Sequence, residues 1–178
     1  MKRKISNFKF QISNYLRSYT LVELLVFMGI VSILLVVLSQ VFASIIDVKL
    51  ESESTSAIEQ DGNYLLARFA YDIQNAQTIN TPASLGQNSS TLDISISGVS
   101  NLYSVNNGFL TVTNDYGVIQ LNSVLTSVSN LDFLRLGNPS DTAREDTIRV
   151  SFTVTSRIVR SSGPEFKNFQ TTVGLRLK

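Results

Sequence analysis

A run of 26 residues, from 21 to 46, contains a single charged side chain, that of Glu23. At about 1.5 Å of rise per residue, a helix over this run is roughly 39 Å long and can cross a hydrocarbon core about 30 Å thick. Such a helix is apolar on every side, so it requires lipid or other chains around it. The run therefore predicts a membrane-spanning segment with one carboxylate at its start, a position where an acid is costly and needs a partner.

The charges on either side orient the run. Five basic residues precede it, and residues 1–18 contain no Asp or Glu; the five are Lys2, Arg3, Lys4, Lys9 and Arg17. Asp47, Lys49, Glu51 and Glu53 follow it directly and are net acidic. Because positive charge gathers on the cytoplasmic side of a membrane segment, we expect a cytoplasmic N-terminus and an extracytoplasmic location for residues 47–178.

The composition excludes several classes of function. Five of the 15 basic residues, but none of the 14 acidic residues, precede position 19, so the remainder has a net charge of −4. We therefore expect no nucleic-acid partner, because phosphate binding requires a basic face. The chain has no Cys and no His, which removes disulfides, most zinc sites and most nucleophile–base pairs. We expect no cofactor, no metal and no enzymatic activity.

Helical spacing continues beyond the membrane run. Gly and Pro are absent from residues 31–61, and polar residues alternate with an apolar stripe at spacings of three, four or seven. Its members are Leu50, Ala57, Ile58, Leu65, Leu66, Phe69, Ile73 and Ala76. This pattern predicts one helix over residues 20–77, amphipathic in its second half, with Gly62 as the place for a local bend.

The period changes to two after a loop predicted over residues 80–90. Apolar and polar residues alternate over 92–96, 148–154 and 169–177, and a weaker strand covers 131–136. Asn106-Asn107-Gly108 and Asn114-Asp115-Tyr116-Gly117 are typical of hairpin turns. We expect an α+β fold, in which the amphipathic part of one long N-terminal helix covers the dry face of a C-terminal antiparallel β-sheet. Phe133, Phe152 and Phe169 are expected in its core.

The segment Ser18-Tyr19-Thr20-Leu21-Val22-Glu23-Leu24-Leu25-Val26, after a short basic leader, resembles the N-terminus of type IV prepilins, the family of pilins and of the pseudopilins of type II secretion. Residues 62–76 and 124–133 resemble minor pilins and minor pseudopilins more than major subunits. The family usually has Gly before the cut and Phe after it, where this chain has Ser18 and Tyr19.

The resemblance implies a division of the chain into a cytoplasmic leader (1–18), a transmembrane and filament-core helix (19–46), its amphipathic continuation (47–77) and an extracytoplasmic β-sheet domain (78–178). It implies cleavage by a prepilin peptidase between Ser18 and Tyr19, and N-methylation of Tyr19. The implied partners are other subunits through the N-terminal helix, the peptidase, an inner-membrane assembly platform and membrane lipid. The location would be the inner membrane first and then a pilus or pseudopilus.

Glu23 has two compatible interpretations. Cleavage would create an α-amine at Tyr19, four residues before the carboxylate, and the two groups could neutralise each other within a chain or between neighbouring chains. This pairing is our hypothesis for the register of assembly. Alternatively, Thr20 and Glu23 have the spacing of a capping box, and the acid favours the positive end of the helix dipole.

Other interpretations remain open. The chain could be a membrane-anchored extracytoplasmic binding domain that never enters a filament, or a secreted protein cut after Val41-Phe42-Ala43. Asp141, Glu145 and Asp146 lie close together and could form a calcium loop, but their spacing fits no EF-hand and Arg144 lies among them. We therefore expect a solvated surface loop. Ser39 and Gln40 interrupt the apolar run and could bond across helices or to their own backbone.

Overall fold

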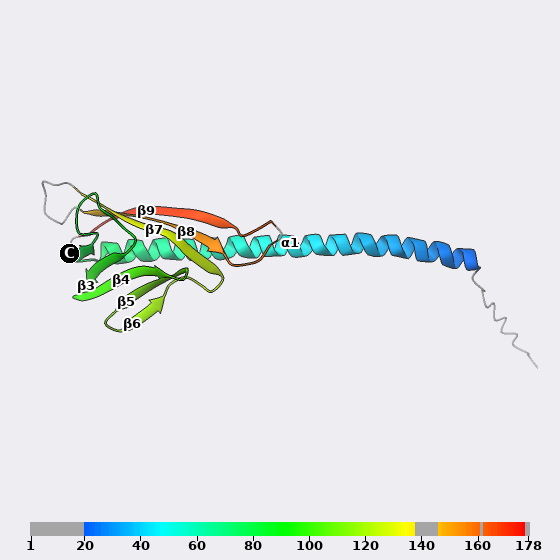
Figure 1. Cartoon of the computed structure of the whole chain (residues 1–178), viewed down its shortest axis with the longest axis horizontal. Coiled ribbons are helices and arrows are strands. Elements are labelled where there is room, and N and C mark those ends of the chain that lie inside the picture. Colours follow the sequence, from blue (N-terminus) through cyan, green and yellow to red (C-terminus); the bar gives the residue numbers. More distant parts are fainter. Residues whose placement is uncertain (1–19, 138–145, 161, 177–178) are drawn as a thin grey trace, which may run out of the picture. The chain divides into compact units, whose positions relative to one another are not determined.

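In the described part of the chain, one helix is followed by antiparallel strands (Figure 1). The structure is a computed structural model that describes residues 20–137, 146–160 and 162–176. Helix α1 is Leu21–Gln74, 54 residues long. The strands are β1 (Thr78–Thr81), β2 (Asn88–Ser89), β3 (Leu92–Ile96), β4 (Val99–Asn106), β5 (Phe109–Asn114), β6 (Gly117–Gln120), β7 (Thr126–Leu136), β8 (Thr147–Ser156) and β9 (Phe166–Gly174). The predicted α+β class is confirmed.

The strands form two sheets, where the sequence analysis predicted one. The first has the order β1-β3-β4-β5-β6 and the second the order β2-β7-β8-β9, and every pairing is antiparallel. Alternation of apolar and polar residues reveals a strand and its buried face, but it does not identify the strand's partner. The chain enters the second sheet at β2, returns to the first for β3 to β6, and enters the second again at β7, so sheet membership does not follow the order of the strands in the chain.

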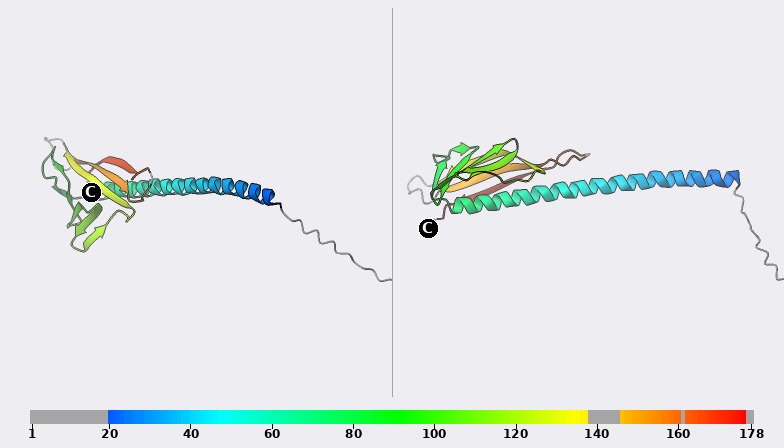
Figure 2. Two further views of the ribbon diagram at one scale, coloured as in Figure 1. Left: turned by 45° about the vertical axis from the view of Figure 1, so that its right-hand side comes forward. Right: turned by 90° about the horizontal axis from the view of Figure 1, so that it is seen from below.

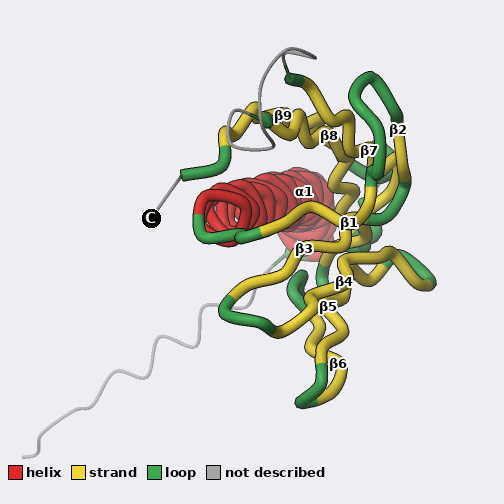
Figure 3. The backbone as a smooth tube through the Cα atoms, turned by 90° about the vertical axis from the view of Figure 1, so that its left-hand side faces the viewer, coloured by secondary structure: helices red, strands yellow, loops and turns green. Residues whose placement is uncertain are grey.

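The C-terminal part of α1 lies between these sheets (Figures 2 and 3). Its buried apolar residues meet those of both sheets in one core. Phe69 is at the centre, with its ring centroid 5.4 Å from those of Tyr103 and Phe133 and 6.0 Å from that of Phe152. Phe133, Phe152 and Phe169 are buried, as predicted. One aromatic side chain of α1 therefore contacts β4 in the first sheet and β7 and β8 in the second.

Helix α1 ends three residues before the predicted position. The Ala76 N–H donates to the Ile73 carbonyl at 3.2 Å, which tightens the last turn. The Gln77 N–H then donates to the Ser95 carbonyl of β3 at 2.8 Å. Since a backbone N–H that binds a neighbouring strand is no longer available to the helix, the sheet determines where α1 stops.

Gly62 allows a close approach of α1 to β9. A Cβ atom at this position would lie 2.1 Å from Cζ of Phe169. The Phe169 ring is held in place by stacking on Phe152, with the centroids 5.6 Å apart. The glycine that suggested a bend in the sequence therefore has a packing role, because only a residue without a side chain leaves room for this ring.

Both predicted hairpin turns are confirmed. Asn106 pairs with Phe109 across the first turn, and Asn114 pairs with Gly117 across the second. Asn107 and Gly108 have φ angles of 51° and 80°, which matches the preference of Asn-Gly for tight two-residue hairpins. Strand β9, in contrast, begins at Phe166 and ends at Gly174, earlier than the predicted 169–177. The Leu175 N–H bonds to the Asp146 carbonyl at 3.0 Å, outside the ladder of β8 and β9.

Candidate functional site

The chain divides into two compact units, Met1–Ser44 and Ile45–Lys178, which we call the N-terminal and C-terminal units. Within the N-terminal unit, every described residue is exposed except Val31, which is half-buried. The apolar stretch of α1 is long and apolar enough to cross a membrane, and none of it is buried within the chain. Its side chains therefore remain available to lipid or to other chains.

Thr20 caps the start of α1. Its Oγ1 accepts a hydrogen bond from the Glu23 N–H at 3.3 Å, and its carbonyl accepts one from the Leu24 N–H at 3.1 Å. This is the threonine half of the capping box that the sequence suggested. The bond uses the backbone of Glu23 rather than its carboxylate, and the Glu23 residue is exposed in the first turn. Ser18 and Tyr19, the expected cleavage and methylation positions, lie outside the described residues.

Two serines in the apolar stretch bond to their own helix. Ser32 Oγ donates to the Met28 carbonyl at 2.8 Å, and Ser39 Oγ donates to the Leu35 carbonyl at 2.9 Å. For Ser39 this is the second of the two alternatives that the sequence left open. A hydroxyl that bonds to the preceding turn is satisfied without a partner chain, so neither serine interrupts the span.

Asp61 holds the loop between β6 and β7 against α1. Its Oδ2 accepts hydrogen bonds from the Ser123 N–H at 2.9 Å, from Ser123 Oγ at 2.7 Å and from Thr126 Oγ1 at 2.5 Å. Asp61 is buried, although its charge suggested an exposed position on the amphipathic helix. Three donors on one oxygen compensate for the loss of water around the carboxylate.

Asp72 forms a second buried contact, this time with the first sheet. It accepts a hydrogen bond from Arg68 Nε at 2.5 Å, one turn earlier in α1, and another from the Tyr103 hydroxyl of β4. Burial raises the pKa of Tyr103 above its ordinary value, and the hydrogen bond to Asp72 raises it further. The two buried acids thus attach α1 to different parts of the strand region.

The raised pKa of Tyr103 predicts a loss of stability at high pH. Below about pH 10 the phenol keeps its proton in both states, and above that pH the unfolded chain loses it while the folded chain retains it. The free energy of unfolding should therefore fall by up to about 1.4 kcal/mol per pH unit through this group. Urea unfolding in detergent, followed at several pH values, should show a steeper fall for the native chain than for Tyr103→Phe. Parallel curves for the two proteins would contradict this assignment.

The position of Asp146 differs from the one expected from the sequence. It was expected in a solvated loop but is buried, and it forms an ion pair with Arg135 of β7. The Arg135 Nη1 also donates to the carbonyls of Pro82 at 3.0 Å and Ala83 at 2.9 Å. This guanidinium therefore ties β7 to the segment that follows β1. Asp141 and Glu145 lie outside the described residues.

The fold and the exposed apolar segment together define a class of protein with a pilin-like architecture. A long N-terminal helix, apolar at its start, packs in its C-terminal part against antiparallel β-sheets. Comparisons with protein-family models, with curated proteins and with solved structures find no match to this chain. The class therefore rests on architecture and on the N-terminal sequence.

Proposed function

We propose that this protein is a structural, non-catalytic subunit of a filament, a minor pilin or pseudopilin of a type IV pilus or a type II secretion-like system. The observation that carries this proposal is the division of α1 into two different surfaces. Its first half exposes apolar side chains all round, and its second half forms the centre of the strand-bearing unit. A helix of this kind can exchange lipid for other helices without disturbing the fold that it carries.

The order of events that we propose follows from the resemblance of residues 18–26 to the N-terminus of type IV prepilins. A prepilin peptidase cuts between Ser18 and Tyr19 and methylates the new N-terminus. The mature subunit waits in the inner membrane, with its C-terminal unit outside, until an assembly platform moves it into a filament. The amine at Tyr19 is paired with a Glu23 carboxylate, which removes two unpaired charges from an apolar surrounding.

Replacing Glu23 with alanine is expected to reduce incorporation of the subunit into filaments by roughly tenfold or more, the effect of losing about 1.4 kcal/mol of pairing. The Thr20 cap should remain, because it uses the backbone of Glu23. Incorporation would be measured as the ratio of sheared filament to total subunit in the native cells. Glu51→Ala, which removes an exposed acid farther along the same helix, is the matched control. Equal incorporation of the two variants would refute the role of Glu23.

The mass of the N-terminal peptide from protein isolated from its own cells tests the function as a whole. A start at Tyr19, with or without a methyl group, is the expected result. A start at Ser44 would identify a secreted domain released after Ala43. Retention of Met1 would identify a plain membrane-anchored binding domain. Either of the last two results overturns the filament proposal.

A further inference from the structure

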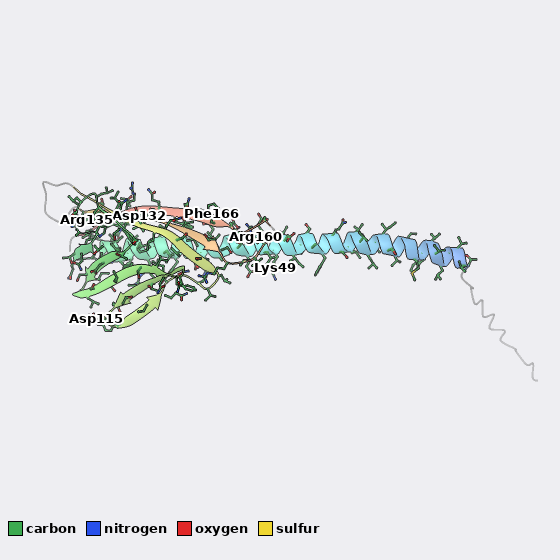
Figure 4. The ribbon with its side chains drawn as sticks, in the orientation of Figure 1. Lys49, Asp115, Asp132, Arg135, Arg160 and Phe166 are labelled. Carbon is green, nitrogen blue, oxygen red and sulfur yellow. The ribbon has the colours of Figure 1, made fainter. Side chains whose placement is uncertain are left out.

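Two strands of the C-terminal unit lie at open edges of their sheets. In the described part of the chain, β6 pairs only with β5, and β9 pairs only with β8. Figure 3 shows these strands on opposite sides of α1, and Figure 4 marks them by Asp115, in the turn before β6, and by Phe166, at the start of β9. Since an edge strand presents unpaired N–H and C=O groups, another strand can add to either sheet there.

The register of β6 shows which of its backbone groups face outward. The Leu121 N–H donates to the Leu110 carbonyl at 2.8 Å, in line with the ladder of β5 and β6. Hydrogen-bonded pairs alternate along an antiparallel ladder, so the N–H and C=O groups of Val118 and Gln120 point away from β5. We call these two exposed residues the β6 edge.

The same reasoning applies to β9. The Ser156 N–H donates to the Glu165 carbonyl at 2.8 Å, in line with the ladder of β8 and β9. The backbone groups of Asn168, Gln170 and Thr172 therefore point away from β8. These three residues are exposed, and we call them the β9 edge.

Neither edge is protected against pairing with another chain. Proteins commonly guard open edges with charged side chains or proline, and β6 contains neither. Strand β9 has one charged residue, Lys167, but its ammonium group forms an ion pair with Glu59 of α1. A second strand can therefore approach both edges without displacing a charge.

Strand β9 runs in the direction of α1. Near its start, Lys167 contacts Glu59 of the helix. Beyond its end, the Arg176 N–H donates to the carbonyl of Gln74, 15 helix residues farther on, at 3.2 Å.

Strand β6 runs in the opposite direction. Ile119 belongs to the cross-strand row of Tyr103, whose hydroxyl contacts Asp72 of α1. The chain then continues to Ser123, which bonds to Asp61, three helical turns earlier. Two copies of the C-terminal unit that point the same way therefore present the β6 edge and the β9 edge to each other as antiparallel strands.

Charge also favours contact between these unlike edges. No Lys or Arg occurs in residues 69–134, which include the whole first sheet, and Asp115 directly precedes the β6 hairpin strand in its turn. Beside the β9 edge, Arg149 of β8 lies opposite Thr172 in the ladder. The two edges thus bring together surfaces of opposite charge. Antiparallel pairing of two β6 edges would instead point one copy in the reverse direction.

We propose that the β6 edge of one subunit pairs with the β9 edge of a second copy of the chain, so that the first sheet of one continues into the second sheet of its neighbour. The proposal rests on the proposed function, because a filament holds its subunits side by side in one direction. A contact between two different surfaces can repeat from copy to copy without closing. Two residues supply only two N–H and two C=O groups, so the pairing is weak alone and forms where α1 already holds the copies together.

The absence of cysteine from the chain permits a direct test by disulfide formation. Val118→Cys subunits would be produced in the native cells together with subunits that carry Asn168→Cys, Gln170→Cys or Thr172→Cys. Tags of different size distinguish heterodimers from homodimers in sheared filaments after mild oxidation. The Cα atoms of directly opposed, hydrogen-bonded residues are about 5.5 Å apart, which suits a disulfide.

Thr113→Cys is the matched control for Val118→Cys. Thr113 lies directly opposite Val118 in β5 and is also exposed, but it is one strand farther from the edge. Adjacent strands are about 4.8 Å apart, so a cysteine at position 113 is out of reach of the neighbour's β9.

We expect Val118→Cys to form heterodimers with one of the three β9-edge variants several-fold more than Thr113→Cys does, and the preferred variant gives the register. Equal heterodimer yields from positions 118 and 113, in subunits that enter the sheared filaments normally, would overturn this proposal and leave the filament role intact. Absence of the native chain from the sheared fraction would overturn both. A predominance of Val118→Cys homodimers would assign the β6 edge to a second β6 edge and also overturn the proposal.

Discussion

Replacing Phe69 with alanine is expected to lower the free energy of unfolding of the C-terminal unit by about 3–5 kcal/mol, the range for losing a large buried aromatic. The side chain is 1% exposed and its ring contacts three others. Those rings come from both sheets, so no single neighbour can move to fill the cavity without leaving its own place. The loss should therefore lie toward the upper part of the range.

Urea unfolding in detergent, followed by far-ultraviolet circular dichroism, measures this loss. Tyr71→Ala is the control, because it removes an aromatic side chain of the same helix that is exposed in the structure. Phe69→Leu should be intermediate, since leucine fills part of the space. An equal effect of Phe69→Ala and Tyr71→Ala would show that the ring does not connect the sheets through α1.

The second large effect is expected for Asp61→Ala, with a loss of about 3 kcal/mol. The substitution leaves the Ser123 N–H and the Thr126 hydroxyl, a fully buried donor, without their acceptor. A buried donor without a partner costs the free energy of its lost hydration. The loop between β6 and β7 should also become more mobile, because it loses its attachment to α1.

Asp61→Asn separates hydrogen bonding from general packing. Its amide oxygen can still accept from the same donors, so we expect a clearly smaller loss than for alanine. Hydrogen exchange of the Ser123 amide provides the local readout, and it should accelerate strongly in Asp61→Ala and weakly in Asp61→Asn. Equal behaviour of the two variants would mean that the acceptor has no part in holding the loop.

The regular elements were predictable because their patterns are local. The apolar stripe of residues 50–76 predicted the helix, and Ile58, Leu65, Phe69 and Ile73 are buried as expected. The alternation over 92–96 coincides with β3, and that over 148–154 lies within β8. In each case the buried residues recur at the backbone period of the helix or strand that carries them. The order of residues in the sequence is therefore enough to identify the buried face.

The contacts between distant segments were not predictable. Asp61 and Asp72 lie outside the predicted apolar stripe, and only the fold supplies the partners that bury them: Ser123, Thr126 and Tyr103. The assignment of strands to two sheets failed for the same reason. No local pattern reports which polar group a buried carboxylate will meet more than 30 residues away.

The candidate site at the start of α1 was predictable only in part. Capping by Thr20 followed from spacing within one turn, and the structure contains its hydrogen bond. The pairing of Glu23 with a new N-terminus stays a prediction, because it depends on cleavage between Ser18 and Tyr19 and on a neighbouring chain. A chemical event and a second molecule are both outside what one sequence can place.

The position of Phe69 has a consequence for the order in which the chain can fold. In the export that we propose, the helix would leave the cytoplasm before any strand, but its buried stripe is completed by Phe152 of β8 and Phe169 of β9, the last two strands. Contacts across such long sequence separations form late. Until β9 has paired with β8, one side of the helix remains an uncovered apolar surface. Addition of β9 to the second sheet is then the step that completes the core.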